Sequence, residues 1–236
     1  MKPPQLRLQL TGQPAWQDPS GRTGLLSRKD AGLLALLAWE GAVPRERALA
    51  LLWQDTPPDK AHASLRQRLF RLRRDTGHDL VQSSASLSLA PGVVHDLSEP
   101  GPEAQPLLAG LDFGDMQALD EWVQGARAQW DARRVDQLTA DAAQAEATGA
   151  WARAIACTQR VLALAPLQEH AWRRLMRLHY LRGDRAAAIV AFEQFEQALA
   201  AEIGGRPSAE TIEQLRQIES AAPPSAPSRR VLPPCL

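Results

Sequence analysis

The sequence predicts two domains of different class, an α+β domain over residues 1–97 and an all-α domain over residues 107–220. Three observations support this prediction. The first domain has the order short strands, three helices and hairpin, which is that of a winged helix-turn-helix. Residues 57–74 have the pattern of an amphipathic basic helix. The segment that begins at Gly149 recurs at Gly183, and this spacing of 34 residues is the tetratricopeptide period.

The chain begins with segments that are typical of short strands. Leu6, Leu8 and Leu10 alternate with polar residues, which predicts a strand with one buried face. Glycine and proline are frequent in residues 12–21, where they indicate turns between further short strands. Residues 80–89 return to an alternating pattern and predict a small hairpin after the helices.

A strongly apolar helix is predicted after these strands. Ser27 is followed three residues later by Asp30, which is a capping-box pattern, and residues 33–39 are mostly apolar. Its first turn carries Arg28 and Lys29, although acidic residues are usual there. The two basic residues either keep this surface soluble or contact phosphate groups, and the sequence leaves both explanations open.

A second, shorter helix opens at Pro44 and covers residues 45–53. A three-residue turn at residues 54–56 then leads into the basic helix, which is expected to start at Pro57 with Thr56 as its cap. Two helices joined by so short a turn form the helix-turn-helix arrangement.

The basic helix has one apolar and one polar face. Ala61, Leu65, Leu69 and Leu72 form a single stripe on a 3.6-residue period. The polar face and its margin carry Lys60, Ser64, Arg66, Gln67, Arg71 and Arg74. Such a helix can pack on a core and enter the major groove of DNA, although a solvated surface helix has the same pattern.

The second half of the chain predicts helices throughout. The two copies of the repeat each predict a pair of antiparallel helices with a glycine in the turn. A last helix is expected from Ser208, which can cap it, to Glu219. Residues 98–106 are rich in proline and are expected to link the two domains, and residues 221–236 are expected to form a flexible Pro/Ala/Ser tail.

The charge distribution and the composition indicate which kinds of partner and which cellular location to expect. The formal net charge is +0, but residues 1–100 hold 13 Lys and Arg against 10 Asp and Glu, whereas residues 101–236 hold 14 against 17. A basic front half fits a module that binds anions. No apolar run is long enough for a membrane helix and no signal peptide is visible, so a cytoplasmic protein with no membrane partner is expected. The two cysteines are far apart in sequence, so no structural disulfide is expected.

No motif for catalysis or for cofactor binding is present in the sequence. The phosphate-binding pattern GxxxxGK[ST] is missing, and so is the Gly-x-Ser-x-Gly elbow. The five histidines lack metal-ligand spacing with each other or with cysteine. The chain is therefore expected to be neither an enzyme nor a metal or cofactor protein.

Several motifs carry a family resemblance. In the front half they are Leu51-Leu52-Trp53-Gln54-Asp55-Thr56-Pro57-Pro58, Leu65-Arg66-Gln67 and Arg71-Leu72-Arg73-Arg74, and in the back half Leu164 to Trp172 and Gly204 to Ser208. With these motifs in this order, residues 5–215 resemble the SARP type (antibiotic regulatory protein) of bacterial transcriptional activators. Such proteins combine a response-regulator-type winged helix with a bacterial transcriptional activator domain. Pro44 and Phe70 depart from the pattern, because a Ser or Thr cap and a small or polar residue are usual at these places.

The resemblance implies that the chain regulates transcription by binding double-stranded DNA. It implies that copies bind side by side on direct repeats near a promoter, as a homodimer on DNA, and contact RNA polymerase. The candidates for base contacts are the six residues of the polar face, Lys60, Ser64, Arg66, Gln67, Arg71 and Arg74. The candidates for phosphate contacts are Arg28, Lys29, Arg45, Arg47 and Arg73. The candidates for contact with the polymerase are Gln54, Asp55, Thr56, Pro57 and Pro58. In larger members an ATPase domain follows, so the chain is either a small member or the front part of a larger protein.

The sequence is also compatible with two other functions. In one, the helical repeats receive a peptide or a signal, and the winged helix binds protein. In the other, the same DNA-binding domain acts as a repressor, because the sequence does not distinguish activation from repression.

Overall fold

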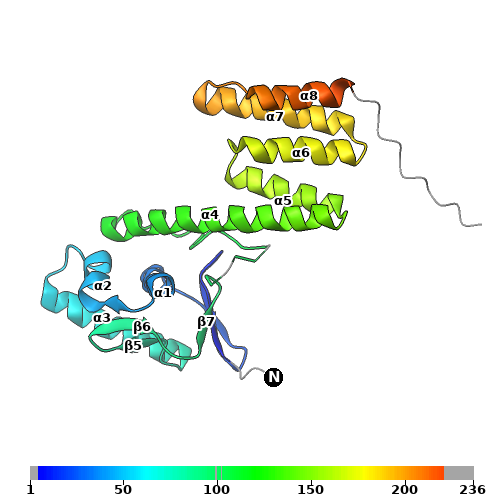
Figure 1. Cartoon of the computed structure of the whole chain (residues 1–236). Coiled ribbons are helices and arrows are strands. Elements are labelled where there is room, and N and C mark those ends of the chain that lie inside the picture. Colours follow the sequence, from blue (N-terminus) through cyan, green and yellow to red (C-terminus); the bar gives the residue numbers. More distant parts are fainter. Residues whose placement is uncertain (1–4, 99, 102, 221–236) are drawn as a thin grey trace, which may run out of the picture. The chain divides into compact units, whose positions relative to one another are not determined.

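The computed structural model describes residues 5–98, 100–101 and 103–220. The chain divides into two compact units, and the boundary along the chain lies between Arg133 and Arg134 (Figure 1). The first is an α+β unit and the second is all helical, as the sequence predicts. Among the described residues no helix is long and apolar enough to span a membrane.

A four-stranded sheet forms one side of the first unit. Its strand order is β3-β2-β1-β7, with β1 antiparallel to β2 and parallel to β7. The strands are β1 (Leu6–Gln9), β2 (Ala15–Gln17), β3 (Thr23–Leu25) and β7 (Val93–His95). Leu6, Leu8 and Leu10 are buried, which confirms the face predicted from their alternation. The sheet thus pairs β1, near the start of the chain, with β7, which follows the predicted hairpin.

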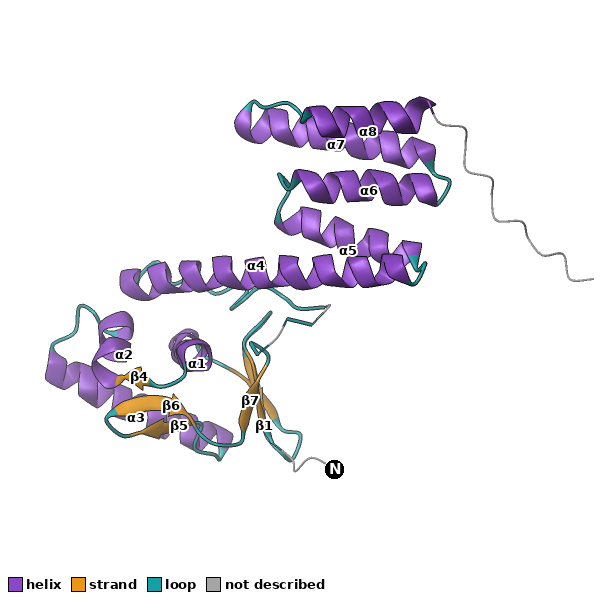
Figure 2. Ribbon diagram, in the orientation of Figure 1, coloured by secondary structure: helices purple, strands orange, loops and turns teal. Residues whose placement is uncertain are grey.

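Three helices and a second small sheet complete the winged helix-turn-helix (Figure 2). The helices are α1 (Arg28–Glu40), α2 (Arg45–Leu52) and α3 (Pro58–Thr76). The second sheet has the order β4-β6-β5, from β4 (Val43–Pro44), β5 (Val81–Ser83) and β6 (Ser86–Leu89). β5 and β6 form the predicted hairpin, which is the wing.

The start of α3 differs from the prediction by one residue. The helix begins at Pro58, and Pro57 is the residue that precedes it, with φ −52° and ψ 142°. Thr56 does not cap the helix, and no side chain does. The reason is steric, because a residue followed by proline is pushed out of the helical region into an extended conformation. Gly77 ends the helix in a left-handed conformation, which glycine adopts without steric cost.

The core of the first unit includes residues beyond the winged helix itself. Phe113, Leu119 and Trp130 are fully buried in the same cluster as Leu34 and Leu65. Two of these three lie on α4 (Gln117–Ala147), the longest helix described. The boundaries expected from the sequence (1–97, 98–106 and 107–220) stay a prediction, while residues 107–130 contribute to the core of the first unit.

Glu40 connects three helices within the first unit. Its carboxylate accepts two hydrogen bonds from the Arg47 guanidinium, at 2.9 and 2.7 Å, and one from Trp122 Nε1 at 2.7 Å. The hydrogen bonds from Arg47, opposed by partial burial and helped by Trp122, lower the pKa of Glu40. A lowered carboxyl pKa stabilises the folded state above the ordinary pKa of about 4.3, and this contribution is lost as the pH falls through the folded-state pKa.

Glu40→Gln is therefore expected to lower the free energy of unfolding at pH 7 by about 1 kcal/mol, a value reduced for partial exposure. Below about pH 4 the difference from the unsubstituted protein should shrink, because the carboxyl group is then neutral in both states. Urea unfolding at the two pH values measures this. Glu46→Gln on α2 is the control, and an equal, pH-independent loss in both variants would contradict the prediction.

The second unit contains the predicted repeat. After the last part of α4 come α5 (Trp151–Leu164), α6 (Glu169–Leu181), α7 (Arg185–Ile203) and α8 (Ala209–Ser220), and consecutive helices run in opposite directions (Figure 1). Gly149 and Gly183 precede the two helix pairs with φ of 70° and 85°, so both turns use the conformation that glycine favours. This confirms the tetratricopeptide-like period. The expected tail, residues 221–236, lies outside the described residues.

Candidate nucleic-acid interface

The inward face of α3 is the one that the sequence predicts. Ala61, Leu65 and Leu72 are buried, and Leu65 has no exposed surface. Leu69 is half-buried and packs at the edge of the same core. Because the helix is fixed by this face, the opposite face is available to a ligand.

The outward face of α3 carries the predicted base-contact residues. Lys60, Arg66, Gln67, Arg71 and Arg74 are exposed, and Ser64 is half-buried. Arg74 pairs with its neighbour Asp75 at 2.9 Å. Within the described part of the chain, the side chains of the other four exposed residues form no hydrogen bond or ion pair. Their donors are thus free to bind an external acceptor.

Arg68 fixes the rotation of α3 against α1. Its guanidinium lies 2.8 Å from the Asp30 carboxylate and 3.0 Å from Ser27 Oγ, at the start of α1. Both partners of this ion pair are largely buried at the side chain, 23% and 16% exposed. The contact joins the middle of α3 to the first turn of α1 and directs Arg68 away from the exposed face.

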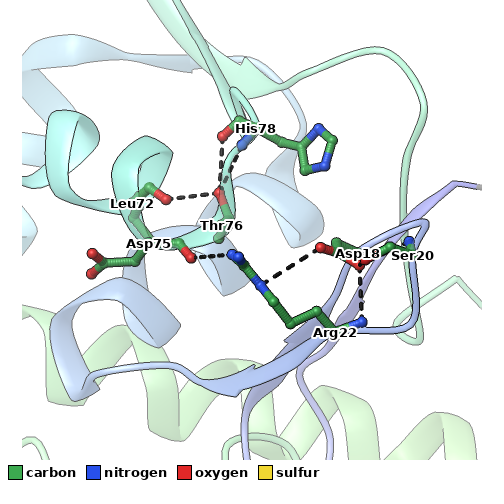
Figure 3. A network of polar contacts seen from close by, with 7 residues as sticks. All are labelled: Asp18, Ser20, Arg22, Leu72, Asp75, Thr76 and His78. Carbon is green, nitrogen blue, oxygen red and sulfur yellow. Dashed lines mark hydrogen bonds and ion pairs between the residues drawn. The ribbon is translucent and has the colours of Figure 1, made fainter.

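The turn between β2 and β3 holds the C-terminal end of α3 (Figure 3). Arg22 Nη2 donates to the backbone oxygen of Asp75 at 2.7 Å, and its guanidinium lies 5.3 Å from the centre of the Trp16 ring. Asp18 orders this turn, because it accepts hydrogen bonds from Ser20 and from the Arg22 backbone. The hydrogen bond from the Ser20 hydroxyl is the main cause that lowers the pKa of Asp18.

Thr76 ties the end of α3 to the start of the wing. Its hydroxyl is buried and lies 2.7 Å from the Leu72 backbone oxygen and 3.0 Å from that of His78 (Figure 3). It also accepts from the His78 backbone nitrogen at 3.2 Å. These contacts connect the last turn of α3 to the segment that leads into the wing.

The five predicted phosphate-contact residues differ in their partners. Arg28 donates to the Asp112 backbone oxygen at 2.9 Å and pairs with Asp115 at 2.6 Å. Lys29 lies 5.3 Å from the centre of the Trp53 ring. Burial, together with the nearby charge of Arg68, lowers the pKa of Lys29.

Of the other three phosphate-contact residues, Arg45 contacts the wing, Arg73 lies on α3, and Arg47 contacts α1. Arg45 donates to Ser83 Oγ at 2.7 Å and to the Ser84 backbone oxygen at 3.0 Å, so its guanidinium sits at the tip of the wing. Arg47 forms the pair with Glu40 described above. Arg73 pairs with Asp79 at 3.3 Å, and both side chains are more than 60% exposed.

The predicted polymerase-contact residues form the turn between α2 and α3. Gln54, Asp55, Pro57 and Pro58 are exposed, and Thr56 is half-buried. Gln54 Oε1 accepts from the Ala118 backbone nitrogen at 2.9 Å, which fixes one side of the turn to the start of α4. A small cavity of about 200 Å³ lies beside the turn. The turn is thus exposed, and the hydrogen bond of Gln54 fixes its position relative to α4.

Sequence patterns do not reveal several of these contacts. Arg22 and Asp75 are 53 residues apart, and Arg28 and Asp115 are 87 apart, so no local spacing predicts either pair. In the described residues no group of three or more His, Cys, Asp or Glu side chains could hold a metal ion.

Comparisons with known proteins give a family model and a similar solved structure. The family model described as the bacterial transcriptional activator domain matches residues 82–219. The structure of Mycobacterium tuberculosis EmbR in complex with a low-affinity phosphopeptide is similar to this chain, with a TM-score of 0.65 and 19% identity. That similarity covers 91% of this chain and 65% of the EmbR chain, and at this identity it shows the fold alone. No curated protein sequence matches the chain.

Proposed function

The chain belongs to the bacterial transcriptional activator domain family, and on this basis we propose that it is a sequence-specific DNA-binding regulator of transcription. The observation that supports DNA binding best is the outward face of α3. It presents Lys60, Arg66, Gln67 and Arg71 without partners among the described residues. A protein with this function works in the bacterial cytoplasm, where the DNA is.

In the proposed complex α3 enters the major groove. The planar guanidinium of arginine can donate to both major-groove acceptors of guanine, and the glutamine amide can pair with adenine in a similar way. Arg66, Gln67 and Arg71 are the side chains best suited to these contacts. Lys60, Ser64 and Arg74 extend the same face toward the two ends of the helix and complete the proposed base-reading surface.

The proposed phosphate contacts lie around this face. Arg45 at the wing tip and Arg73 at the end of α3 are nearest to the proposed groove. Arg28, Lys29 and Arg47 would contact phosphates farther out. An exposed ion pair stabilises a protein by only about 0–1 kcal/mol, so exchange of a carboxylate partner for a phosphate group costs little.

We further propose that two copies bind side by side on direct repeats and act as an activator. The exposed turn Gln54–Pro58 and the helical unit would contact RNA polymerase. The fixed position of Gln54 supports this, because a surface that is already ordered loses little entropy on binding.

A peptide-binding role for the helical unit is the second candidate. A groove of about 460 Å³ lies between α6 and α8, and Tyr180, Ile218, Glu210 and Glu213 are among its lining residues. A basic or amphipathic peptide would fit this surface. A regulator can combine both functions, so a failure of peptide binding leaves the DNA proposal intact.

Fluorescence anisotropy with labelled duplex DNA at several salt concentrations tests DNA binding. Five phosphate-contact residues are proposed in each copy, so the logarithm of the binding constant of one copy should fall with the logarithm of salt concentration with a slope of about −4.5. No binding at low salt, or binding that does not depend on salt, would contradict the proposed function.

A further inference from the structure

The exposed face of α3 contains one large apolar side chain. Phe70 is 66% exposed and lies outside the hydrophobic core, although its neighbour Leu69 packs against that core. From its position we propose that Phe70 recognises a thymine by contact with the 5-methyl group in the major groove. This inference rests on the proposed DNA-binding function.

The helical period places Phe70 inside the proposed base-reading surface. Gln67 precedes it by three residues and Arg66 by four, and Arg74 follows it by four. Residues at these spacings are neighbours on the surface of an α-helix. Ala63, two turns before Phe70, is also exposed and carries only a methyl group. The helix can therefore approach a base edge closely here, with the ring and the polar donors facing it together.

The surrounding charge favours DNA as the occupant. A single exposed apolar side chain is common on protein surfaces and has no meaning by itself. Here the helical period places the ring beside Arg66 and Gln67, whose donors an apolar protein surface would leave unsatisfied. Duplex DNA supplies acceptors for these donors, and its major groove contains one apolar group, the thymine methyl.

Phe70 would recognise a different chemical group from the one that its polar neighbours recognise. Arginine and glutamine can distinguish guanine and adenine by their acceptors and donors, whereas the thymine methyl offers no hydrogen bond. An aromatic ring gains free energy when it covers a methyl group and removes it from water. Phe70 would thus set the preference for thymine at one position of each half-site.

A cycle of protein and DNA changes tests this inference. The DNA is a duplex selected from random sequences by the unsubstituted full chain, with each thymine in turn replaced by deoxyuridine, which lacks only the methyl group. The proteins are the unsubstituted chain, Phe70→Ala and Phe70→Leu. The control is Ile203→Ala in the second unit, where the side chain is 65% exposed.

At one thymine, deoxyuridine should weaken binding by the unsubstituted chain about fourfold, which corresponds to the loss of one buried methyl group. Phe70→Ala should bind the thymine duplex at least as weakly and show no further loss with deoxyuridine. Phe70→Leu should keep part of the discrimination, and Ile203→Ala should keep all of it. Unchanged thermal unfolding of Phe70→Ala will show that the fold is retained.

Three results would overturn the inference. The first is that Phe70→Ala and the replacement by deoxyuridine weaken binding independently of each other at every thymine. The second is that Phe70→Ala binds the selected duplex as tightly as the unsubstituted chain. The third is that the selected DNA motif contains no thymine. In each case the chain still binds DNA, so the proposed function stands. If the unsubstituted chain binds no duplex, the proposed function and this inference fall together.

Discussion

Replacement of both Arg71 and Arg74 by alanine is expected to weaken binding to the selected duplex at least about tenfold. One good base contact by arginine contributes about 1–3 kcal/mol of discrimination, and both residues lie on the exposed face of α3. Arg71 has no partner among the described residues and Arg74 pairs only with an exposed neighbour, so the fold should be little affected. Anisotropy titration measures the loss.

The matched control removes the same charge from the second unit. Arg153 and Arg182 are both exposed there, and no described residue pairs with their side chains. Arg153→Ala with Arg182→Ala should change the affinity less than about threefold, because only long-range attraction is lost and salt screens it. Equal losses in the two double variants would show that α3 has no special role.

Leu65→Ala is expected to lower the free energy of unfolding by about 2–5 kcal/mol. Leu65 is fully buried in the core of the first unit, so its truncation removes apolar contacts and leaves a cavity. Denaturant unfolding of the full chain measures the change.

Leu25→Ala is the matched control, since it makes the same chemical change on β3 at a side chain that is 66% exposed. It should change the free energy of unfolding by no more than about 0.5 kcal/mol. A near-neutral Leu65→Ala would mean that the opposite face of α3 is the one packed inward.

Local rules explain why much of the fold could be predicted. Ser27 accepts a hydrogen bond from the Asp30 backbone nitrogen at 3.4 Å, as the capping pattern indicates. The apolar stripe of α3 follows directly from the 3.6-residue period, and the repeat glycines adopt positive φ values. Each of these features depends on residues within a few positions of one another.

The features that could not be predicted depend on distant residues or on competing local effects. Arg28 is a candidate for a phosphate contact, and the sequence gives no sign that Asp115 lies within 2.6 Å of it. The helix α3 starts one residue later than the cap preference of Thr56 predicts, because Pro58 keeps Pro57 out of the helical conformation. Arg22 shows no local pattern, although it holds the end of α3.

Selection of bound duplexes from a random library by the full chain tests the central claim most directly. We predict enrichment of one short motif, repeated in the same orientation at a spacing near a whole number of helical turns, because two copies are proposed to bind side by side on one face of the DNA. The Arg71→Ala, Arg74→Ala double variant should fail to enrich it. A library that stays random with the unsubstituted chain would contradict the claim that the protein reads DNA sequence.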